Sequence, residues 1–484
     1  MLCFRRLLLI LIIFLFAFFS CQRSQTEKES IKYVFLFIGD GMGVAQVNLT
    51  EAYLAAINNE KGFQQLSFTK MPQTGLVKTF ADNRFITCSA AAGTAFATGY
   101  KTNINHISTD SSGLVPFKSI ATICKEQGMK VGILSSVSID HATPAVFYAN
   151  QPHRSNYFKI DLELANSDFD FFGGGGLRSP EDTLDGRLVN ALDLAKENGF
   201  TYVDSYSGLM NLKPGDEKII AVHPEIMPGN AAMPYVIDQP TAPTLAEFTR
   251  KAIELLENEN GFFMMVEGGK IDWACHSDDA ATTIHETIAF DDAVQVALDF
   301  YKQHPDETLI VVTADHETGG LALGAQKTAY ESHFNYLQYQ KISIDKFSSV
   351  IVDFQKKLSG NYETDINNLL DLVAENFGLG KEIPITAEDK STLWFAFEKS
   401  MQTAKNGKTM YSDFPSISET IVNMVSEKAG VGWTTYAHTG INVPIYAIGP
   451  GAELFSGVID NTDIPGILMG QLGIEQAAYS LEEE

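Results

Sequence analysis

The chain has 484 residues, and its 60 acidic residues outnumber its 35 basic ones. The formal net charge of -25 excludes nucleic acid as a natural partner of the surface as a whole, because such a partner requires basic surfaces that neutralise phosphates. The length exceeds that of a usual single domain, but large α/β folds with insertions reach it.

The first 20 residues have the pattern of an export signal. Arg5 and Arg6 precede an apolar stretch that is shorter than a membrane-spanning helix requires. A serine and then Cys21 follow, in a pattern that resembles a lipoprotein cleavage site. We therefore predict a signal peptide over residues 1–20, lipidation of Cys21, and a short flexible tether over the polar residues 21–30. A plain signal peptide or an uncleaved anchor is the alternative.

Lipidation of Cys21 would make the membrane a partner of this chain. We expect an exported protein that is periplasmic or anchored to the outer membrane as a lipoprotein. After cleavage, the other cysteines would be Cys88, Cys124 and Cys275. We expect no disulfide framework among them despite the export.

The first predicted element of the mature chain is a short buried strand, Val34–Ile38, with Asp40 among the glycines that follow it. The next feature is Ser89, which precedes a run of small residues and predicts the start of a helix. The free N–H groups and the dipole of a helix start favour an anion. No general base is evident beside Ser89, so a nearby metal ion is the expected means of activating its hydroxyl. The alternative is an ordinary N-cap serine.

Arg154 follows the strand-like stretch VGILSS and the stretch HATPA. A guanidinium group offers a planar fork that matches two phosphate oxygens, although most arginines simply lie on the surface. The four glycines Gly173–Gly176 predict a tight loop and not a phosphate-binding loop, because no Lys-Ser/Thr pair follows them.

The stretch VEGGKIDWACH follows a second apolar run, residues 261–266, and begins the next group of polar side chains. It contains Glu267, Asp272 and His276. If the chain turns into a helix there, the i, i+4 spacing puts Asp272 and His276 on one face. An Asp and a His on one face can share a divalent ion such as zinc.

A third apolar run, Leu309–Val312, leads directly to Asp315 and His316. Uninterrupted runs of this kind predict parallel strands with helices on both faces. Since ligands bind beyond the carboxyl ends of such strands, the three polar groups should meet at one rim and hold more than one metal ion. Carboxylates this close would repel one another without cations. The alternative is that they are solvated or cap helices in ordinary loops.

The rest of the chain completes an α/β fold with a central, mostly parallel sheet and helices on both faces. The polar segment from about residue 326 to 428 has helical periodicity and predicts a helical insertion. His438 lies beyond it, in a loop before another apolar strand, Val443–Ile448. A loop histidine is more often structural than a ligand, unless other ligands converge on it.

Six stretches together resemble the alkaline phosphatase family, and they occur in the family's order between about Tyr33 and Asp463. They are IGDGMG, CSAAAGTAFATGYKT, HATPA with the later Arg154, VEGGKIDWACH, VTADHE and HTG. The resemblance implies a bacterial, metal-dependent phosphomonoesterase with the family's α/β sandwich over residues 31–475. It implies hydrolysis of small phosphate monoesters through a phosphoserine, with two zinc ions and one magnesium ion. It leaves a homodimer open.

The resemblance also implies a role for each matched residue. Ser89 matches the nucleophile, and Arg154 matches the residue that binds the non-bridging oxygens of the phosphate. The implied metal ligands are Asp272, His276 and His438 for one zinc, Asp40, Asp315 and His316 for the other, and Asp40, Thr143 and Glu267 for magnesium.

Three positions depart from the pattern of many relatives. Cys88 precedes the nucleophile where many members carry Asp, so an Asp that orients the arginine is absent. His141 and Trp273 are expected beside the magnesium ligands, at positions where some members carry Asp and Lys. A neutral imidazole anchors the water shell of magnesium less well than a carboxylate, so we expect a weaker hold on magnesium.

Other functions of the same superfamily are a sulfatase or a phosphodiesterase. A sulfatase needs a Cys or Ser followed by x-Pro-x-Arg, which the sequence after Cys88 and Ser89 lacks. Diester hydrolases usually place Thr as the nucleophile and lack a match to Arg154. A further alternative, from a different class, is a non-catalytic lipoprotein that binds phosphorylated ligands. Such a protein would be expected to have lost metal ligands, whereas every ligand that can be placed is present in this sequence.

Overall fold

The computed structural model describes residues 31–239, 242–403 and 414–474. The predicted signal peptide (1–20), the lipidated Cys21 and the tether (21–30) lie outside the described residues. Within the described ranges, no helix has the length and apolar character needed to cross a membrane.

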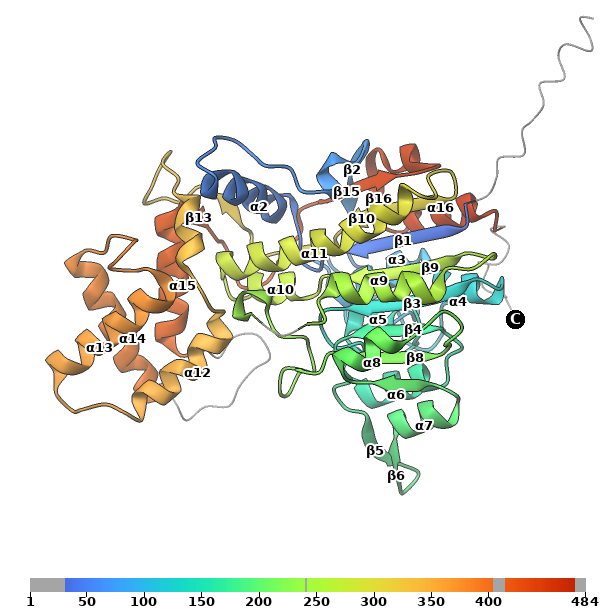
Figure 1. Ribbon diagram of the computed structural model, residues 1–484, viewed down its shortest axis with the longest axis horizontal. Helices are drawn as coiled ribbons and strands as arrows, with labels where there is room; N and C mark the ends of the chain where they lie inside the picture. The colour runs from blue at the N-terminus through green and yellow to red at the C-terminus, as the bar shows by residue number, and fades with distance from the viewer. Residues whose placement is uncertain (1–30, 240–241, 404–413, 475–484) are drawn as a thin grey trace, which may run out of the picture.

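A ten-stranded sheet forms the centre of the molecule (Figure 1). The prediction of a mostly parallel sheet is confirmed, because only one strand, β15, runs antiparallel to its neighbours β10 and β2. In spatial order the strands are β16 (Gly457–Asp460), β2 (Gln73–Lys78), β15 (Val443–Ile448), β10 (Thr308–Thr313), β1 (Tyr33–Ile38), β9 (Phe262–Glu267), β3 (Lys130–Ser135), β4 (Phe171–Gly174), β8 (Ile219–Val222) and β7 (Thr201–Val203).

The three strands that lead to the candidate metal ligands lie side by side in this sheet. Strand β1 pairs in parallel with β10 on one side and with β9 on the other, and all three are buried along their whole length. Ile38 at the end of β1 is level with Thr313 and with Glu267. The segments that follow these strands therefore leave the sheet at one edge, as expected for parallel strands.

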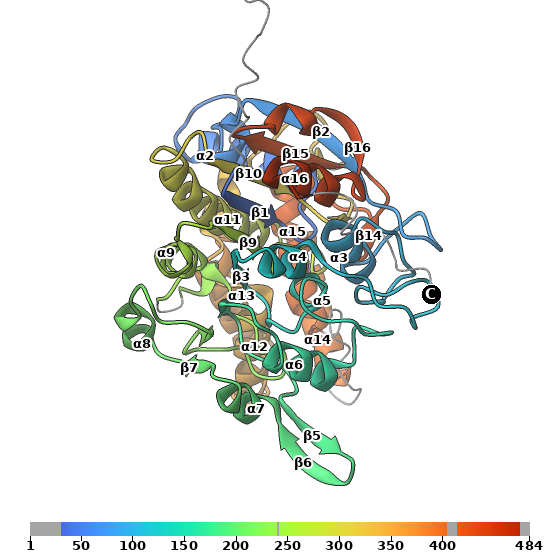
Figure 2. The ribbon, with the colours of Figure 1, turned by 90° about the vertical axis from the view of Figure 1, so that its right-hand side faces the viewer.

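Helices cover both faces of the sheet. The bounds of those in the main fold are α2 (Val44–Ile57), α3 (Ser89–Thr98), α4 (Ile120–Glu126), α5 (Ala142–Ala145), α6 (Tyr157–Ala165), α7 (Ala191–Glu197), α8 (Tyr206–Asn211), α9 (Leu245–Leu256), α10 (Lys270–Cys275), α11 (Ala280–Tyr301) and α16 (Asp463–Leu472). Figure 2 shows α9 and α11 on one side of the strands and α3, α4 and α16 on the other.

Helix α9 illustrates how the sequence builds a covering helix. Thr244 and Glu247 form a capping box, in which each side chain accepts the backbone N–H of the other residue. The helix is amphipathic and buries Phe248, Leu255 and Leu256 toward β3 and β4. Burial of this apolar face stabilises the helix more than its intrinsic propensity does.

The segment expected as a helical insertion, about residues 326–428, gathers beside the sheet, at the left in Figure 1. Its helices share buried apolar side chains such as Phe347, Phe377 and Phe397. Strand β12 (Ala322–Leu323) pairs with β13 (Val431–Gly432), so the chain leaves and rejoins the main fold at one place. The helices are η3 (Phe334–Tyr339), α12 (Ile344–Gln355), α13 (Tyr362–Phe377), α14 (Ala387–Thr403) and α15 (Ser416–Ala429).

The tight loop predicted over Gly173–Gly176 is wrong for its first half, because Gly173 and Gly174 belong to β4. The backbone of β3 passes close to Gly174: a Cβ atom there would be 1.9 Å from the carbonyl oxygen of Ser135. Gly174 also has a φ of +120°, which other residues rarely adopt. Glycine is therefore needed here for a close strand contact and not for a turn.

Two carboxyl groups, Asp140 in the loop before α5 and Asp161 in α6, are buried next to each other. Asp140 accepts a hydrogen bond from the backbone N–H of Arg178 at 2.7 Å, whereas neither oxygen of Asp161 has a hydrogen-bond partner. Burial raises the pKa of Asp140 to about 6. Burial and the neighbouring Asp140 raise the pKa of Asp161 well above its usual range.

Such raised pKa values make stability depend on pH. A carboxyl group of this kind stabilises the folded state below the pKa of the unfolded chain, and this contribution is lost as pH rises through the folded-state pKa. Replacing Asp161 by Asn removes one titrating group. Between about pH 4 and pH 7, the free energy of unfolding of the wild type should therefore fall relative to that of Asp161→Asn, by at least about 1 kcal/mol.

The measurement is chemical denaturation of metal-stripped wild type and variant at several pH values. Asp182→Asn, in the exposed strand β5 (Glu181–Leu184), which pairs with β6 (Arg187–Asn190), is the matched control. It should leave the pH dependence of the wild type unchanged. If the free energies of unfolding of the wild type and Asp161→Asn changed in parallel with pH, the pKa of Asp161 would not be raised in the folded state.

Candidate active site

The side chains that follow β1, β9 and β10 converge at the carboxyl edge of the sheet, and His438 joins them. Instead of lying in the predicted loop, His438 forms the two-residue strand β14 (His438–Thr439), which pairs with β11 (Glu317–Thr318) directly after His316. The potential ligand atoms form three groups, and those of each group lie within 4.8 Å of one another. The groups are Asp272, His276 and His438; Asp40, Asp315 and His316; and Asp40, His141 and Glu267.

In the first group, His276 and His438 turn their Nε2 atoms toward each other. The Nδ1 atom of His276 lies 2.6 Å from the carbonyl oxygen of Tyr436. The Nδ1 atom of His438 lies 3.0 Å from the carbonyl oxygen of Thr87. A carbonyl oxygen only accepts, so each Nδ1 carries a proton, and in its neutral form each ring leaves Nε2 bare to bind a cation. The two Nε2 atoms are 3.2 Å apart, where two acceptors repel unless a cation binds both.

Asp272 completes this group from the first turn of the short helix α10. Its carboxylate oxygens lie 3.4 Å from Nε2 of His276 and 3.7 Å from Nε2 of His438. Burial alone would raise the pKa of Asp272, but the positive charge of His276, and then of His438 and His316, in their protonated forms outweighs burial and holds this pKa well below its usual range. One ionised carboxylate and two bare imidazole nitrogens are a donor set that fits zinc.

The second group is fully buried. The Nε2 atom of His316 lies 3.4 Å from Asp40 and 3.4 Å from Asp315. Neither oxygen of Asp40 has a hydrogen-bond partner, and Oδ2 of Asp315 has none. Burial and the charge of Asp315 raise the pKa of Asp40 well above its usual range, and burial and the charge of Asp272 raise the pKa of Asp315 to about 8. A cation here would neutralise both carboxylates and satisfy their oxygens.

The third group consists mainly of oxygen atoms. Ser135 donates a short hydrogen bond to one oxygen of Glu267, while the other oxygen of Glu267 has no hydrogen-bond partner. The buried hydroxyl of Thr143, in α5, has none either. Carboxylate and hydroxyl oxygens suit magnesium. His141, expected only beside these ligands, comes within 3.8 Å of Glu267, and burial lowers the pKa of its imidazole although Glu267 opposes this.

Ser89 is the first residue of α3, as predicted, and its side chain does not cap the helix. Cys88 is the N-cap residue, and the hydroxyl of Ser89 lies 3.4 Å from Nε2 of His316. Ser89 is therefore beside the second group and at a helix start that favours an anion. Arg154 approaches from a separate loop, and its Nη2 atom is 2.7 Å from Nε2 of His141.

Trp273, which the sequence placed near the third group, packs edge-on against His141. Their ring centroids are 6.1 Å apart at an interplanar angle of 75°. The structure thus gathers all the predicted candidates at one edge of the sheet. They come from the ends of β1, β9 and β10, from β14, from helices α3, α5 and α10, and from the loops before α5 and α6.

One residue in this site was missed by sequence reasoning. The hydroxyl of Thr318 donates to Oδ1 of Asp272 at 2.5 Å and lies 3.2 Å from Nδ1 of His316. A hydroxyl that donates to the carboxylate accepts from the Nδ1–H of His316, which leaves Nε2 of that ring bare as well. Thr318 therefore orients one residue from each of the first two groups. Apart from its place two residues after His316, the sequence has no signal that marks Thr318.

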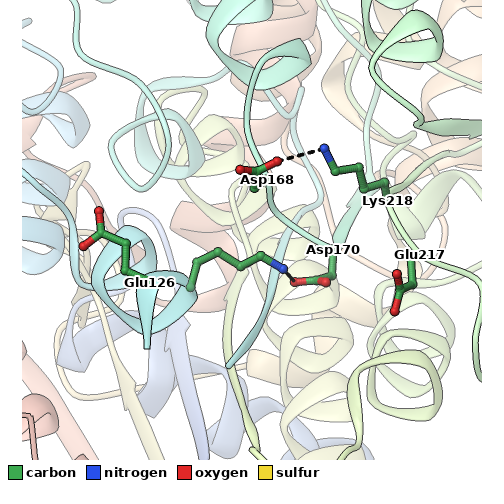
Figure 3. A pocket seen from close by; sticks show the side chains of 6 residues that line it. Glu126, Asp168, Asp170, Glu217 and Lys218 are labelled. Carbon is green, nitrogen blue, oxygen red and sulfur yellow. Dashed lines mark hydrogen bonds and ion pairs between the residues drawn. The ribbon is translucent and has the colours of Figure 1, made fainter. Parts of the chain in front are cut away.

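A cavity elsewhere on the molecule is lined by ion-paired side chains (Figure 3). It lies at the amino ends of β3, β4 and β8, which is the opposite edge of the sheet. Lys125 pairs with Asp170 at 2.7 Å, and Lys218 pairs with Asp168 at 2.9 Å. The other two carboxylates that line it, Glu126 and Glu217, pair with Lys118 and Lys130.

A comparison with models of known protein families shows to which family this site and fold belong. The family model described as alkaline phosphatase matches residues 31–474. The chain belongs to the alkaline phosphatase family. As a member of that family it is a phosphoric monoester hydrolase, as the sequence resemblance implied.

Relatives and solved structures agree with this family assignment. The chain is 31% identical to alkaline phosphatase 3 of Bacillus subtilis, over 92% of this chain and 89% of that protein. It is 32% identical to alkaline phosphatase 4 of the same organism, over 91% and 89%.

Two solved alkaline phosphatases have similar folds. The cold-active enzyme from Shewanella sp. matches with a TM-score of 0.76 and 28% identity, over 91% of this chain and 99% of that one. The enzyme of the Antarctic bacterium TAB5 matches with a TM-score of 0.64 and 26% identity, over 93% and 100%. A variant of the TAB5 enzyme, with Asp in place of a His, has Mg bound in a site called M3.

The role of Thr318 gives a testable prediction. Thr318→Val removes the hydroxyl that orients Asp272 and His316 and keeps the shape of the side chain. Loss of an outer contact of this kind typically weakens metal binding about 10–100-fold. We expect zinc to be extracted from the variant at correspondingly lower chelator concentrations, followed with a zinc-sensitive dye.

Thr318→Ser retains the hydroxyl and is the matched control, which should hold zinc as the wild type does. Equal zinc retention by Thr318→Val and Thr318→Ser would show that this hydroxyl does not orient the ligands.

Proposed function

We propose that this chain hydrolyses phosphate monoesters to an alcohol and inorganic phosphate through a phosphoserine on Ser89, with two zinc ions and one magnesium ion. The observation that carries this proposal is the position of Ser89. Its hydroxyl lies at a helix start, 3.4 Å from Nε2 of His316, beside buried carboxyl groups several of whose oxygens have no hydrogen-bond partner. Such a hydroxyl can be activated by a metal ion without a general base.

The donor sets decide which residues would hold each ion. Imidazole nitrogens with carboxylates suit zinc, and an all-oxygen set suits magnesium. When bound, the ions would supply positive charge that stabilises the Ser89 oxygen, the leaving oxygen and the phosphate. The proposed ligands are Asp272, His276 and His438 for one zinc, Asp40, Asp315 and His316 for the other, and Asp40, Thr143 and Glu267 for magnesium.

The side chains of this chain then divide the reaction between them. Ser89 gives up its hydroxyl proton to solvent, and its Oγ forms a bond to phosphorus as the bond from phosphorus to the ester oxygen breaks. That oxygen takes up a proton from solvent and leaves as the alcohol. Water cleaves the phosphoserine in the second half-reaction and releases inorganic phosphate. Throughout, Arg154 binds two phosphate oxygens with its planar fork, and the N–H groups at the start of α3 face the same anion.

A hydrolysis assay tests this proposal against the other functions of the superfamily. The protein is stripped with a chelator, reloaded with zinc and magnesium, and given p-nitrophenyl phosphate, bis(p-nitrophenyl) phosphate or p-nitrophenyl sulfate. We expect the monoester to be the preferred substrate and its turnover to require the added metals. Preference for the diester or the sulfate, or phosphate binding without turnover, would contradict the proposal.

The nucleophile can be tested separately from turnover. Ser89→Ala removes the oxygen that becomes phosphorylated but none of the proposed metal ligands. The variant should retain the zinc and magnesium content of the wild type and lose all covalent labelling by radioactive phosphate at acidic quench. Ser111→Ala, at an exposed serine on a nearby loop, is the control and should label normally. Labelling that persists in Ser89→Ala would assign the phosphoserine to another residue.

We further propose that the chain is an exported lipoprotein, held at the membrane through Cys21. The support is the basic, apolar and Ser-Cys pattern of its first residues. Stable anchoring requires two acyl chains, which a modified Cys21 would carry. Cys21→Ser should move the protein from the membrane fraction to the soluble exported fraction. Membrane association that is unchanged in Cys21→Ser would indicate an uncleaved apolar anchor.

A further inference from the structure

His141 is a buried residue that lies between Arg154 and the third ligand group. Its Nε2 atom is 2.7 Å from Nη2 of Arg154, and its Nδ1 atom is 3.8 Å from Oε1 of Glu267. A guanidinium group has only donors, so Nε2 of His141 must be the acceptor and carries no proton. The proton of the neutral ring is then on Nδ1, on the side of Glu267.

The ring of His141 is itself held in place. Trp273 packs edge-on against it, and the buried ammonium group of Lys270 lies 4.7 Å from the ring of Trp273. The same ammonium group lies 3.3 Å from the ring of Tyr235, so it is enclosed by aromatic faces. The imidazole therefore offers Nε2 to Arg154 in a fixed direction.

Cys88 does not provide the same support to the guanidinium group. Its thiol accepts the backbone N–H of Asn105 at 3.2 Å, and the carbonyl oxygen of Asn105 accepts the backbone N–H of Arg154 at 2.7 Å. This chain of contacts holds the main chain of Arg154. The direction of its long side chain must be set by contacts further out, among which is the hydrogen bond to His141.

We propose that His141 is a positioning residue that holds the guanidinium group of Arg154 in its phosphate-binding orientation. The inference rests on the proposed function, because that function assigns the phosphate to Arg154. An arginine held in place before the ligand arrives loses less rotational freedom when phosphate binds. The single imidazole thereby supports phosphate binding from beside the third ligand group, although His141 itself does not touch phosphate.

Binding of inorganic phosphate, measured by calorimetry, tests this without relying on turnover. All proteins carry Ser89→Ala to prevent covalent labelling and are loaded with zinc and magnesium. In this background His141→Phe, which has no acceptor, should raise the Kd for phosphate about tenfold, as expected for loss of a hydrogen bond to a charged group. His141→Gln keeps an acceptor oxygen and should restore most of the affinity.

A double-mutant cycle decides whether His141 acts through Arg154. Arg154→Ala should weaken phosphate binding, and adding His141→Phe to it should cause no further loss. His153→Phe makes the same exchange at the exposed neighbour of Arg154, whose ring contacts Ser155, and should leave the Kd unchanged. Metal analysis of each protein, and repetition with magnesium omitted, separates an effect on the arginine from a loss of magnesium.

The outcomes are distinct. Equal losses from His141→Phe in the presence and absence of the Arg154 side chain would overturn the inference, and so would a His141→Gln variant as weak as His141→Phe. If Arg154→Ala itself left phosphate binding unchanged, the assignment of Arg154 in the proposed function would fail together with the inference. Monoester hydrolysis by the otherwise unaltered protein would still stand in both cases, because it is measured independently.

Discussion

The candidate active site depends on buried carboxyl groups that the fold brings together without pairing them with basic side chains. Asp40, Glu267 and Asp315 are buried where β1, β9 and β10 end, and several of their oxygens have no hydrogen-bond partner. Next to them, His276 and His438 bring two bare nitrogens to 3.2 Å. Buried carboxylates repel one another when ionised, which is why the pKa values of Asp40 and Asp315 are raised, and bound cations would let these groups stay ionised in this geometry. The local positive charge would also offset the net charge of -25, which disfavours an incoming phosphate.

Sheet register is the means by which these groups meet. Three parallel strands end level with one another, so residues 229 and 275 positions apart leave the sheet at one edge. This part could be predicted from the sequence, because an uninterrupted apolar run reports burial on both faces, and because parallel strands place their carboxyl ends together. The start of α3 at Ser89 could be predicted for a similar local reason, the run of small residues after it.

Other parts of the site depend on contacts that no local pattern encodes. His438 reaches the rim through a pairing of only two residues between β14 and β11, too short to have a periodicity. Thr318 orients Asp272 and His316 through one hydroxyl, and a threonine after a DHE stretch has no distinctive spacing. His141 contacts Arg154 across a loop, so its role as an acceptor emerges only from the fold. The loop predicted at the glycines of β4 was wrong because glycine occurs where two strands come close together as well as in turns.

The central claim is that two groups of bare ligand atoms bind zinc beside Ser89. The most direct test is a crystal structure of the zinc-loaded protein with anomalous diffraction recorded on both sides of the zinc absorption edge. Our account predicts one zinc peak among Asp272, His276 and His438, and a second among Asp40, Asp315 and His316, next to the hydroxyl of Ser89. A fully loaded crystal with no zinc peak at these two positions, or with zinc only elsewhere, would contradict it.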